Sequence, residues 1–165
     1  MTPASRYLQC EGREIHFMEW GAGHDEVVIA WHGLARTGRD MDAIAAHLAQ
    51  RYRVICPDAP GRGLSQWSPA PEREYCLAFY EALAVSLLAQ LGITRCHWLG
   101  TSMGGAIGLH AAAGPLRGHI RRLVLNDIGP QLADAAVARI RSYAGSPPDF
   151  ASMGELETYF RTVYQ

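Results

Sequence analysis

The sequence predicts an α/β fold in which a predominantly parallel sheet is flanked by helices on both faces. Strand-length apolar runs alternate with helical patterns along the 165 residues, and this alternation is typical of chains that build a parallel sheet. The run 27–31, Val-Val-Ile-Ala-Trp, is continuously apolar, as expected for a strand that is covered on both faces. Right-handed crossovers between such strands place helices on both sides of the sheet.

Each predicted element follows from apolar spacing and from the turn residues beside it. Glu11-Gly12-Arg13 separates two strands that we expect to form an antiparallel hairpin. Asp40 is expected to cap a helix, and a long helix is expected to begin at Pro71 and to end before Gly92. In order, the predicted elements are strands 7–10, 14–20 and 27–31, a helix after Asp40, strand 54–56, helix 71–91, strand 96–99, a helix after residue 102, strand 123–125, and helices 134–143 and 153–164.

The composition is that of a globular protein and excludes several classes of partner. Hydrophobic residues make up 48% of the chain and charged residues 19%, which argues against intrinsic disorder. The formal net charge of −1 gives no electrostatic basis for binding nucleic acid or an anionic membrane. No apolar stretch is long enough to span a bilayer, and the N-terminus lacks the apolar segment of a signal peptide. We therefore expect no nucleic-acid partner and no membrane partner.

Cysteine usage and motif content predict a cytoplasmic protein that works without a metal or another cofactor. The four cysteines form no Cys-x-x-Cys pair, and two of them fall in predicted buried strands. Reduced thiols in the cytoplasm are therefore expected. The sequence contains no phosphate-binding P-loop motif and no cluster of metal-ligating residues.

The segment Gly100-Thr101-Ser102-Met103-Gly104 is a Gly-x-Ser-x-Gly motif between a predicted strand and a predicted helix. This is the setting of a nucleophile elbow, a sharp turn that presents a serine hydroxyl above the sheet. We expect Gly100 and Gly104 to be required because a Cβ at either position would collide with that hydroxyl. The motif alone is weak evidence, since a glycine-rich loop with an unreactive serine also matches it. The strand and the helix around it favour the nucleophile.

Several polar residues come directly after predicted strands: His32, Asp58, Ser102 and Asp127. The carboxyl ends of parallel strands meet at one edge of the sheet, where ligands of such folds bind. The sequence therefore predicts that this edge collects the candidate site residues.

Three motifs together resemble the α/β-hydrolase superfamily over residues 7–130. They are His32-Gly33 after an apolar strand, the loop 58–65 with the sequence Asp-Ala-Pro-Gly-Arg-Gly-Leu-Ser, and Gly100 to Gly105. The resemblance implies that the chain is the N-terminal portion of a serine hydrolase with this fold.

The resemblance also implies roles for individual residues. Ser102 would be the catalytic nucleophile, and the backbone N–H groups of Leu34 and Met103 would form the oxyanion hole. His32 would orient its loop and would not act as the base. Asp58 is expected to stabilise a turn. Asp127 is left with two interpretations, the acid of a catalytic triad or a structural residue that hydrogen-bonds nearby backbone.

In this family the triad runs Ser, then Asp or Glu, then His along the chain, and no histidine follows Asp127. We therefore expect residues 1–130 to be the first part of a hydrolase core and residues 131–165 to be the start of a helical lid. The triad base, and its acid too if Asp127 is structural, are expected beyond Gln165, so the 165-residue chain alone should be inactive. The strand 123–125 would then be an open edge that invites self-association.

The leading functional hypothesis is a serine hydrolase that acts on an ester or a similar small acyl substrate through an acyl-enzyme. The same framework also hosts hydrolases of carbon–carbon bonds in ring-cleavage products. A third possibility, from a different class, is a non-catalytic binding protein that keeps the fold without a working triad.

Overall fold

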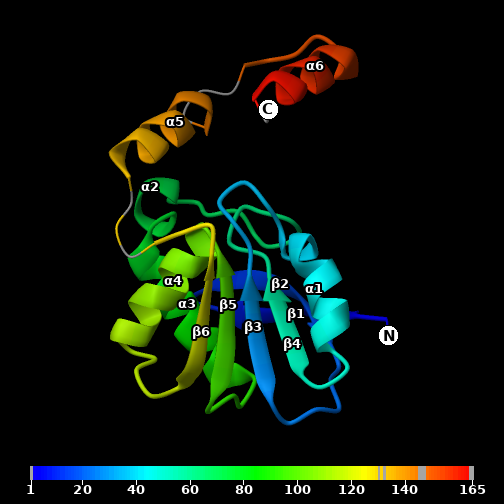
Figure 1. The fold of residues 1–165 in the computed structure, drawn as a ribbon, viewed down its shortest axis with the longest axis vertical. Helices are drawn as coiled ribbons and strands as arrows, with labels where there is room; N and C mark the ends of the chain where they lie inside the picture. The colour runs from blue at the N-terminus through cyan, green and yellow to red at the C-terminus, as the bar shows by residue number, and fades with distance from the viewer. Residues whose placement is uncertain (1, 130, 132, 145–147, 164–165) are drawn as a thin grey trace. The chain divides into compact units, whose positions relative to one another are not determined.

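The structure is a computed structural model that describes residues 2–129, 131, 133–144 and 148–163. Within these residues the chain forms a mixed six-stranded sheet with the strand order β1-β2-β4-β3-β5-β6 and with helices on both faces, which confirms the predicted fold class (Figure 1). The strands are β1 Ala4–Cys10, β2 Arg13–Trp20, β3 Val27–Trp31, β4 Arg53–Pro57, β5 Cys96–Thr101 and β6 Ile120–Asn126. The helices are the short 3₁₀ helix η1 Gly38–Met41 and the α-helices α1 Asp42–Leu48, α2 Pro71–Glu74, α3 Leu77–Gln90, α4 Met103–Ala113, α5 Asp134–Ala144 and α6 Met153–Val163.

Strands β1 and β2 form the predicted antiparallel hairpin, and most of the remaining sheet is parallel. Glu11 and Gly12 connect the two strands with φ angles of 51° and 72°, the left-handed conformation that a two-residue hairpin turn needs. β2 pairs antiparallel with β4, whereas β3 lies parallel between β4 and β5, and β5 pairs parallel with β6. Since β3 and β5 are neighbours, the loops that follow them meet at the same edge of the sheet.

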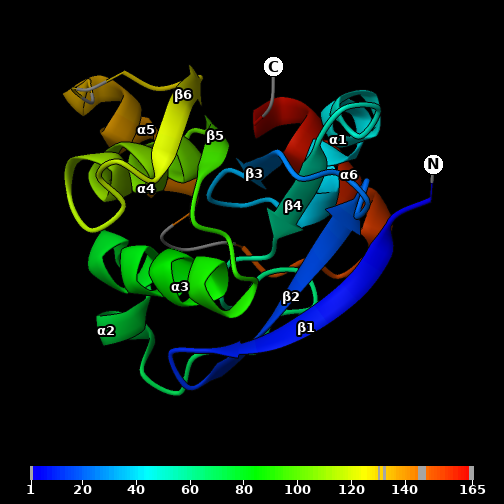
Figure 2. The ribbon, with the colours of Figure 1, turned by 90° about the horizontal axis from the view of Figure 1, so that it is seen from below.

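The two faces of the sheet bury separate hydrophobic clusters. On one face α3 and α4 cover a cluster that includes Trp31 and Trp98, whose stacked rings have centroids 5.4 Å apart. On the other face η1 and α1 cover a smaller cluster that includes Met41 and Ala45. Figure 2 shows α3 and α4 on one side of the strands and α1 on the other. Burial from both sides explains why β3 is apolar along its whole length.

The helix predicted over 71–91 is wrong as a single element. α2 ends at Glu74, and Tyr75 and Cys76 leave helical geometry with ψ angles of 58° and 161° before α3 begins. Two contacts hold Tyr75 in this position. The Arg62 guanidinium lies over its ring at 5.1 Å, and its hydroxyl accepts the Ser68 N–H at 3.2 Å.

Asp40 does not cap a helix, contrary to the prediction. It lies inside η1, and the residue that precedes α1 is Met41, which makes no side-chain capping bond. The turn is anchored instead by Asp58, whose Oδ1 accepts the Gly38 N–H at 2.5 Å. A contact between distant residues therefore replaces the local cap.

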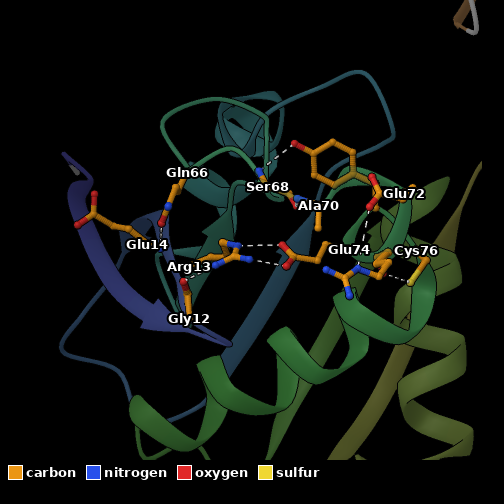
Figure 3. A network of polar contacts seen from close by, with 11 residues as sticks. Gly12, Arg13, Glu14, Gln66, Ser68, Ala70, Glu72, Glu74 and Cys76 are labelled. Atoms are coloured by element: carbon orange, nitrogen blue, oxygen red, sulfur yellow. Dashed lines mark hydrogen bonds and ion pairs between the residues drawn. The ribbon is translucent and has the colours of Figure 1, made fainter.

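A polar network fastens α2 and the loop after β4 to the hairpin (Figure 3). Arg13 of β2 donates from Nε to Oε2 of Glu74 at 2.8 Å and from Nη2 to Oε1. This hydrogen-bonded pairing raises the pKa of Arg13 and lowers the pKa of Glu74. Glu14 donates its N–H to Gln66 Oε1 at 2.9 Å, and Gln66 returns its own N–H to the Glu14 carbonyl at 2.8 Å. The hairpin thus holds the loop at Gln66 and α2 at Glu74.

The chain divides into two compact units, Met1–Pro130 and Gln131–Gln165. The second unit contains α5 and α6. In it, the rings of Phe150 and Tyr159 lie with centroids 5.2 Å apart, and Arg161 pairs with Glu157 one helical turn away at 2.7 Å. Among the described residues no helix has both the length and the apolar character that a membrane crossing requires.

Candidate active site

Ser102 sits on a strained turn between β5 and α4. Its φ is 49° and its ψ is −112°. Residues other than glycine rarely adopt this backbone conformation, which costs about 1–3 kcal/mol. The turn is held on both sides, since the Ser102 N–H donates to the Asn126 carbonyl at 2.9 Å and the Ser102 carbonyl accepts the Ala106 N–H at 3.0 Å. Strain that the surrounding structure maintains in this way is typical of a functional site.

The glycines of the motif are required for a different reason from the one predicted. A Cβ at Gly100 would lie 2.3 Å from the carbonyl carbon of Gly104, and a Cβ at Gly104 would lie 2.2 Å from the carbonyl oxygen of Trp31. Neither collision involves the Ser102 hydroxyl. The glycines let the start of α4 approach the backbone of β5 and β3, and this close approach produces the sharp turn.

The loop after β3 lies directly beside Ser102. Trp31 is paired with Gly100 in the parallel register of β3 and β5, and a Cβ at Gly33 would lie 3.7 Å from the Ser102 Cβ. Within the described chain, the backbone N–H groups of Leu34 and Met103 donate to no acceptor. Met103 is also the first residue of α4, where unpaired N–H groups carry partial positive charge. Two free donors therefore lie on segments that meet at the serine.

His32 is fully buried and uses both ring nitrogens for structure. Its Nδ1 donates to the Gly33 carbonyl at 2.6 Å, and its Nε2 accepts the Ala59 N–H at 2.9 Å. Burial lowers the pKa of His32 and so favours the neutral ring. The side chain links the end of β3 to the end of β4, and both of its ring nitrogens are engaged in these hydrogen bonds.

Arg62 fixes the same loop from the outside, a role that sequence reasoning did not find. Its Nε donates to the Leu34 carbonyl at 3.1 Å, and its Nη1 donates to the Pro60 carbonyl at 2.8 Å and to the Tyr80 hydroxyl at 2.9 Å. The guanidinium also lies over the rings of Tyr75 and Tyr80. Arg62 thus holds the residue that carries one of the two free N–H groups.

None of the seven histidines hydrogen-bonds Ser102 in the part of the chain that the structure describes. His110 is paired with Glu81 of α3. His24 and His119 lie within hydrogen-bonding distance of backbone carbonyls. His97 has a buried Nδ1 without a partner among the described residues, and burial, with Arg122 nearby, lowers its pKa.

Asp58 and Asp127 differ sharply in their surroundings. Asp58 is buried, and it accepts the Leu64 N–H at 2.9 Å within its own loop, so the predicted turn role is present. It also contacts Gly38 and His16, so it joins three segments. Asp127 is exposed at the end of β6 with φ 56°. Its carboxylate makes no hydrogen bond within the described residues, so the expected bond to nearby backbone is not observed there.

Comparison with known proteins identifies the family. The profile of the family described as alpha/beta hydrolase fold matches residues 26–155. This chain belongs to the α/β-hydrolase fold family. The matched range includes both loops that meet at Ser102 as well as the loop that follows β4.

Individual proteins match between 59% and 98% of this chain. A 3-hydroxybutyrate-oligomer hydrolase from Cupriavidus necator is 40% identical over 98% of this chain and 56% of its own length. The crystal structure of an alpha/beta hydrolase from Novosphingobium aromaticivorans superposes with a TM-score of 0.79 at 36% identity, over 91% of this chain and 53% of that one. A 2-hydroxy-6-oxononadienedioate/2-hydroxy-6-oxononatrienedioate hydrolase from a Pseudomonas species is 33% identical over 59% of this chain and 35% of its own length. The chain spans about half the length of the first two.

Proposed function

We propose that this chain carries the nucleophile and the oxyanion hole of a serine hydrolase that cleaves carboxylic esters. The observation that supports the proposal most strongly is Ser102 on its strained turn beside two unpaired N–H groups. In the proposed reaction Ser102 Oγ attacks the ester carbonyl carbon and forms an acyl-enzyme. The oxygen that becomes negative accepts the N–H groups of Leu34 and Met103. Each such donor stabilises the transition state by about 2.7–4 kcal/mol.

As the substrate class we propose short oligoesters of hydroxy acids. The support is the relative named as a 3-hydroxybutyrate-oligomer hydrolase, which matches nearly the whole chain. Hydrolysis of a carbon–carbon bond is the second candidate, because a relative named for a 2-hydroxy-6-oxo diacid also matches, although over a shorter segment. Assaying the 3-hydroxybutyrate dimer beside a 2-hydroxy-6-oxo dienedioate distinguishes the two reactions.

The described residues do not place a general base beside Ser102. A serine hydroxyl is a weak nucleophile until a neighbouring base accepts its proton, and the described histidines are engaged elsewhere or lie on other elements. The curated relative matched over most of this chain is nearly twice as long. We propose that the triad histidine lies in the part of the relatives that this chain does not cover, with the acid there or at Asp127. We expect the 165-residue chain alone to turn over esters poorly.

This expectation defines a direct test of the proposed function. The chain is incubated with p-nitrophenyl butyrate, with and without added imidazole as a soluble base, and the acylated peptide is identified by mass spectrometry. We expect imidazole to accelerate butyrylation of Ser102 and expect Ser102→Ala to remove that adduct with an unchanged far-UV circular dichroism spectrum. Ser142→Ala, at an exposed position in α5, is the matched control. A folded chain in which Ser102 is never acylated would favour the non-catalytic binding protein.

We also propose that residues 131–165, which form the second compact unit, are the start of a helical lid. A protease test addresses this, and we expect cleavage near residue 131 to leave residues 1–130 folded. The cleavage should alter substrate preference more than it alters the rate at which a small ester acylates Ser102.

The edge strand β6 gives a proposal for self-association. In the described residues β6 pairs only with β5, and Val124 is 53% exposed. A strand edge with free N–H and C=O groups can pair with a second copy. We expect Val124→Lys to reduce self-association in sedimentation velocity. An unchanged monomer–oligomer distribution would contradict this proposal.

We propose a reducing compartment, the cytoplasm, as the site of action. Cys10, Cys56 and Cys96 are buried free thiols, and burial raises the pKa of Cys96 to about 11. Such thiols are unreactive and structural. Localisation of a tagged protein by fractionation tests this assignment.

A further inference from the structure

Three side chains, Ser5, His16 and Asp58, form a hydrogen-bonded chain that does not include Ser102. Ser5 Oγ lies 2.8 Å from His16 Nε2, and His16 Nδ1 lies 2.8 Å from Asp58 Oδ2. His16 and Asp58 are each 2% exposed, whereas Ser5 is exposed on the edge strand β1. In the strand order, β4 and β3 separate the hairpin from β5 and Ser102.

The register of the sheet brings the three residues together. Tyr7 is directly opposite His16 in the hairpin, so Ser5, two residues earlier, projects from the same face and reaches His16 diagonally. On the other side of β2, the Asp58 N–H donates to the His16 carbonyl at 2.9 Å. Each residue therefore occupies a position that backbone pairing fixes.

The contacts of Asp58 determine the direction of the hydrogen bonds. Its Oδ1 accepts the Gly38 N–H and its Oδ2 accepts the Leu64 N–H, so the group acts as a carboxylate that only accepts. With Asp58 as the acceptor, we assign the proton of the bond between His16 Nδ1 and Asp58 Oδ2 to His16 Nδ1. In the neutral ring Nε2 is then unprotonated and accepts the Ser5 hydroxyl. This is the polarity of a Ser-His-Asp triad, in which geometry and roles, and not sequence position, define the members.

We propose that Ser5, His16 and Asp58 form a second serine acylation site, which accepts small acyl groups from donors with good leaving groups. Ser5 Oγ bonds to the acyl carbonyl carbon while its proton moves to His16 Nε2. The tetrahedral adduct collapses, the bond from the carbonyl carbon to the leaving group breaks, and the leaving group departs with the electron pair and takes up the proton from His16. The product is an acyl ester of Ser5.

The expected rate accelerations indicate which acyl donors this site can use. A positioned base accelerates such a step by about 10²–10⁴-fold. A donor preorganised for the oxyanion adds about 10²–10³-fold, and Ser5 lies on an exposed edge strand, whereas Ser102 lies at the start of a helix. We therefore expect Ser5 to become acylated by activated donors and to release the acyl group slowly.

The test uses the 165-residue chain carrying Ser102→Ala, so that its outcome does not depend on the proposed function. The protein is treated with p-nitrophenyl acetate, and the acetylation rate of the peptide with Ser5 is compared with that of the peptide with Ser142. Ser142 is an exposed serine whose hydroxyl donates to a carbonyl of its own helix. We expect Ser5 to react at least about 100-fold faster and expect Ser5→Ala to remove the adduct. Equal rates at the two serines would overturn the proposal.

A second variant tests the base itself. His16→Gln keeps a side chain that can donate and accept hydrogen bonds but that cannot take up the proton. We expect Ser5 acetylation to fall at least about tenfold in the folded variant. An unchanged rate would show that Ser5 reacts through exposure alone and would refute its assignment to a triad. If His16→Gln does not fold, the comparison of Ser5 with Ser142 still decides the question.

Discussion

Gly104→Ala is the substitution that tests the elbow most sharply, because two effects of known sign oppose each other there. Gly104 is the second residue of α4, and alanine in a helix is favoured over glycine by about 1 kcal/mol. The added Cβ, however, would lie 2.2 Å from the Trp31 carbonyl oxygen and 2.9 Å from the His32 carbonyl oxygen. Both are backbone atoms of β3 and its loop, which cannot rotate away.

The collision should dominate. The 2.2 Å separation is more than 1 Å short of ordinary van der Waals contact, so α4 must move away from the sheet. Overpacking of this kind costs about 1–3 kcal/mol or more, and a rigid obstacle places Gly104→Ala at or above the upper end. After the gain in helix propensity we expect a net loss of about 2 kcal/mol. For a domain of this size the melting temperature should fall by about 4–8 °C.

Urea denaturation followed by tryptophan fluorescence measures the effect, since Trp31 and Trp98 are buried in the affected layer. Gly23→Ala is the matched control. Gly23 is an exposed glycine with nothing within 4 Å of the added Cβ, and the change should leave stability equal or raise it by up to about 1 kcal/mol. A Gly104→Ala protein as stable as the wild type would refute the close-approach explanation of the motif.

Three further predictions use the same protein. Asp127→Asn should change the free energy of unfolding by less than about 0.5 kcal/mol, because the side chain is exposed and Asn also tolerates a left-handed backbone; a loss above about 1 kcal/mol in the same urea titration would contradict this. The wild-type free energy of unfolding should fall as pH drops below about 6.5, since the unfolded chain takes up a proton that burial disfavours on native His32; His32→Gln should flatten that part of the pH profile, and an unchanged slope would exclude the residue as its source. Arg62→Ala should slow imidazole-assisted acylation of Ser102 about tenfold, equivalent to about 1.4 kcal/mol, by loosening Leu34, and guanidinium ion should restore part of the rate; failure of rescue with intact folding would contradict the positioning role.

Sequence reasoning succeeded where the signal was local. The continuous apolar run at 27–31 identified a strand buried on both faces, and the Glu11-Gly12 turn identified the hairpin. The motif around Ser102 combined a strand, two glycines and a helix within a few residues, so the elbow could be located. Family membership followed from the spacing of such local motifs.

It failed where a distant residue decided the outcome. Helical periodicity continues through Tyr75, but at the break the Tyr75 ring stacks under Arg62 and its hydroxyl accepts the Ser68 N–H. The prediction of an Asp40 cap was wrong because Asp58, eighteen positions away, anchors that turn.

The chain of Ser5, His16 and Asp58 was missed for a related reason. These residue types are common on strands and no short motif joins them. One signal was available: a two-residue turn at Glu11-Gly12 fixes the hairpin register and places Ser5 diagonal to His16. The pairing of β2 with β4, which brings Asp58 to the other side of His16, could not be read from one sequence.

The central claim is that Ser102 and the N–H groups of Leu34 and Met103 form one acyl-transfer site. The most direct measurement is a crystal structure of the 165-residue chain after reaction with a fluorophosphonate in the presence of imidazole, which supplies the missing base; the phosphonyl oxygen occupies the place of the oxyanion. We expect phosphorus bonded to Ser102 Oγ, with that oxygen about 2.7–3.1 Å from both backbone nitrogens. A phosphonate on Ser102 whose oxygen points away from Leu34 and Met103 would contradict the claim. A crystal in which another serine carries the phosphonate and Ser102 does not would also contradict it.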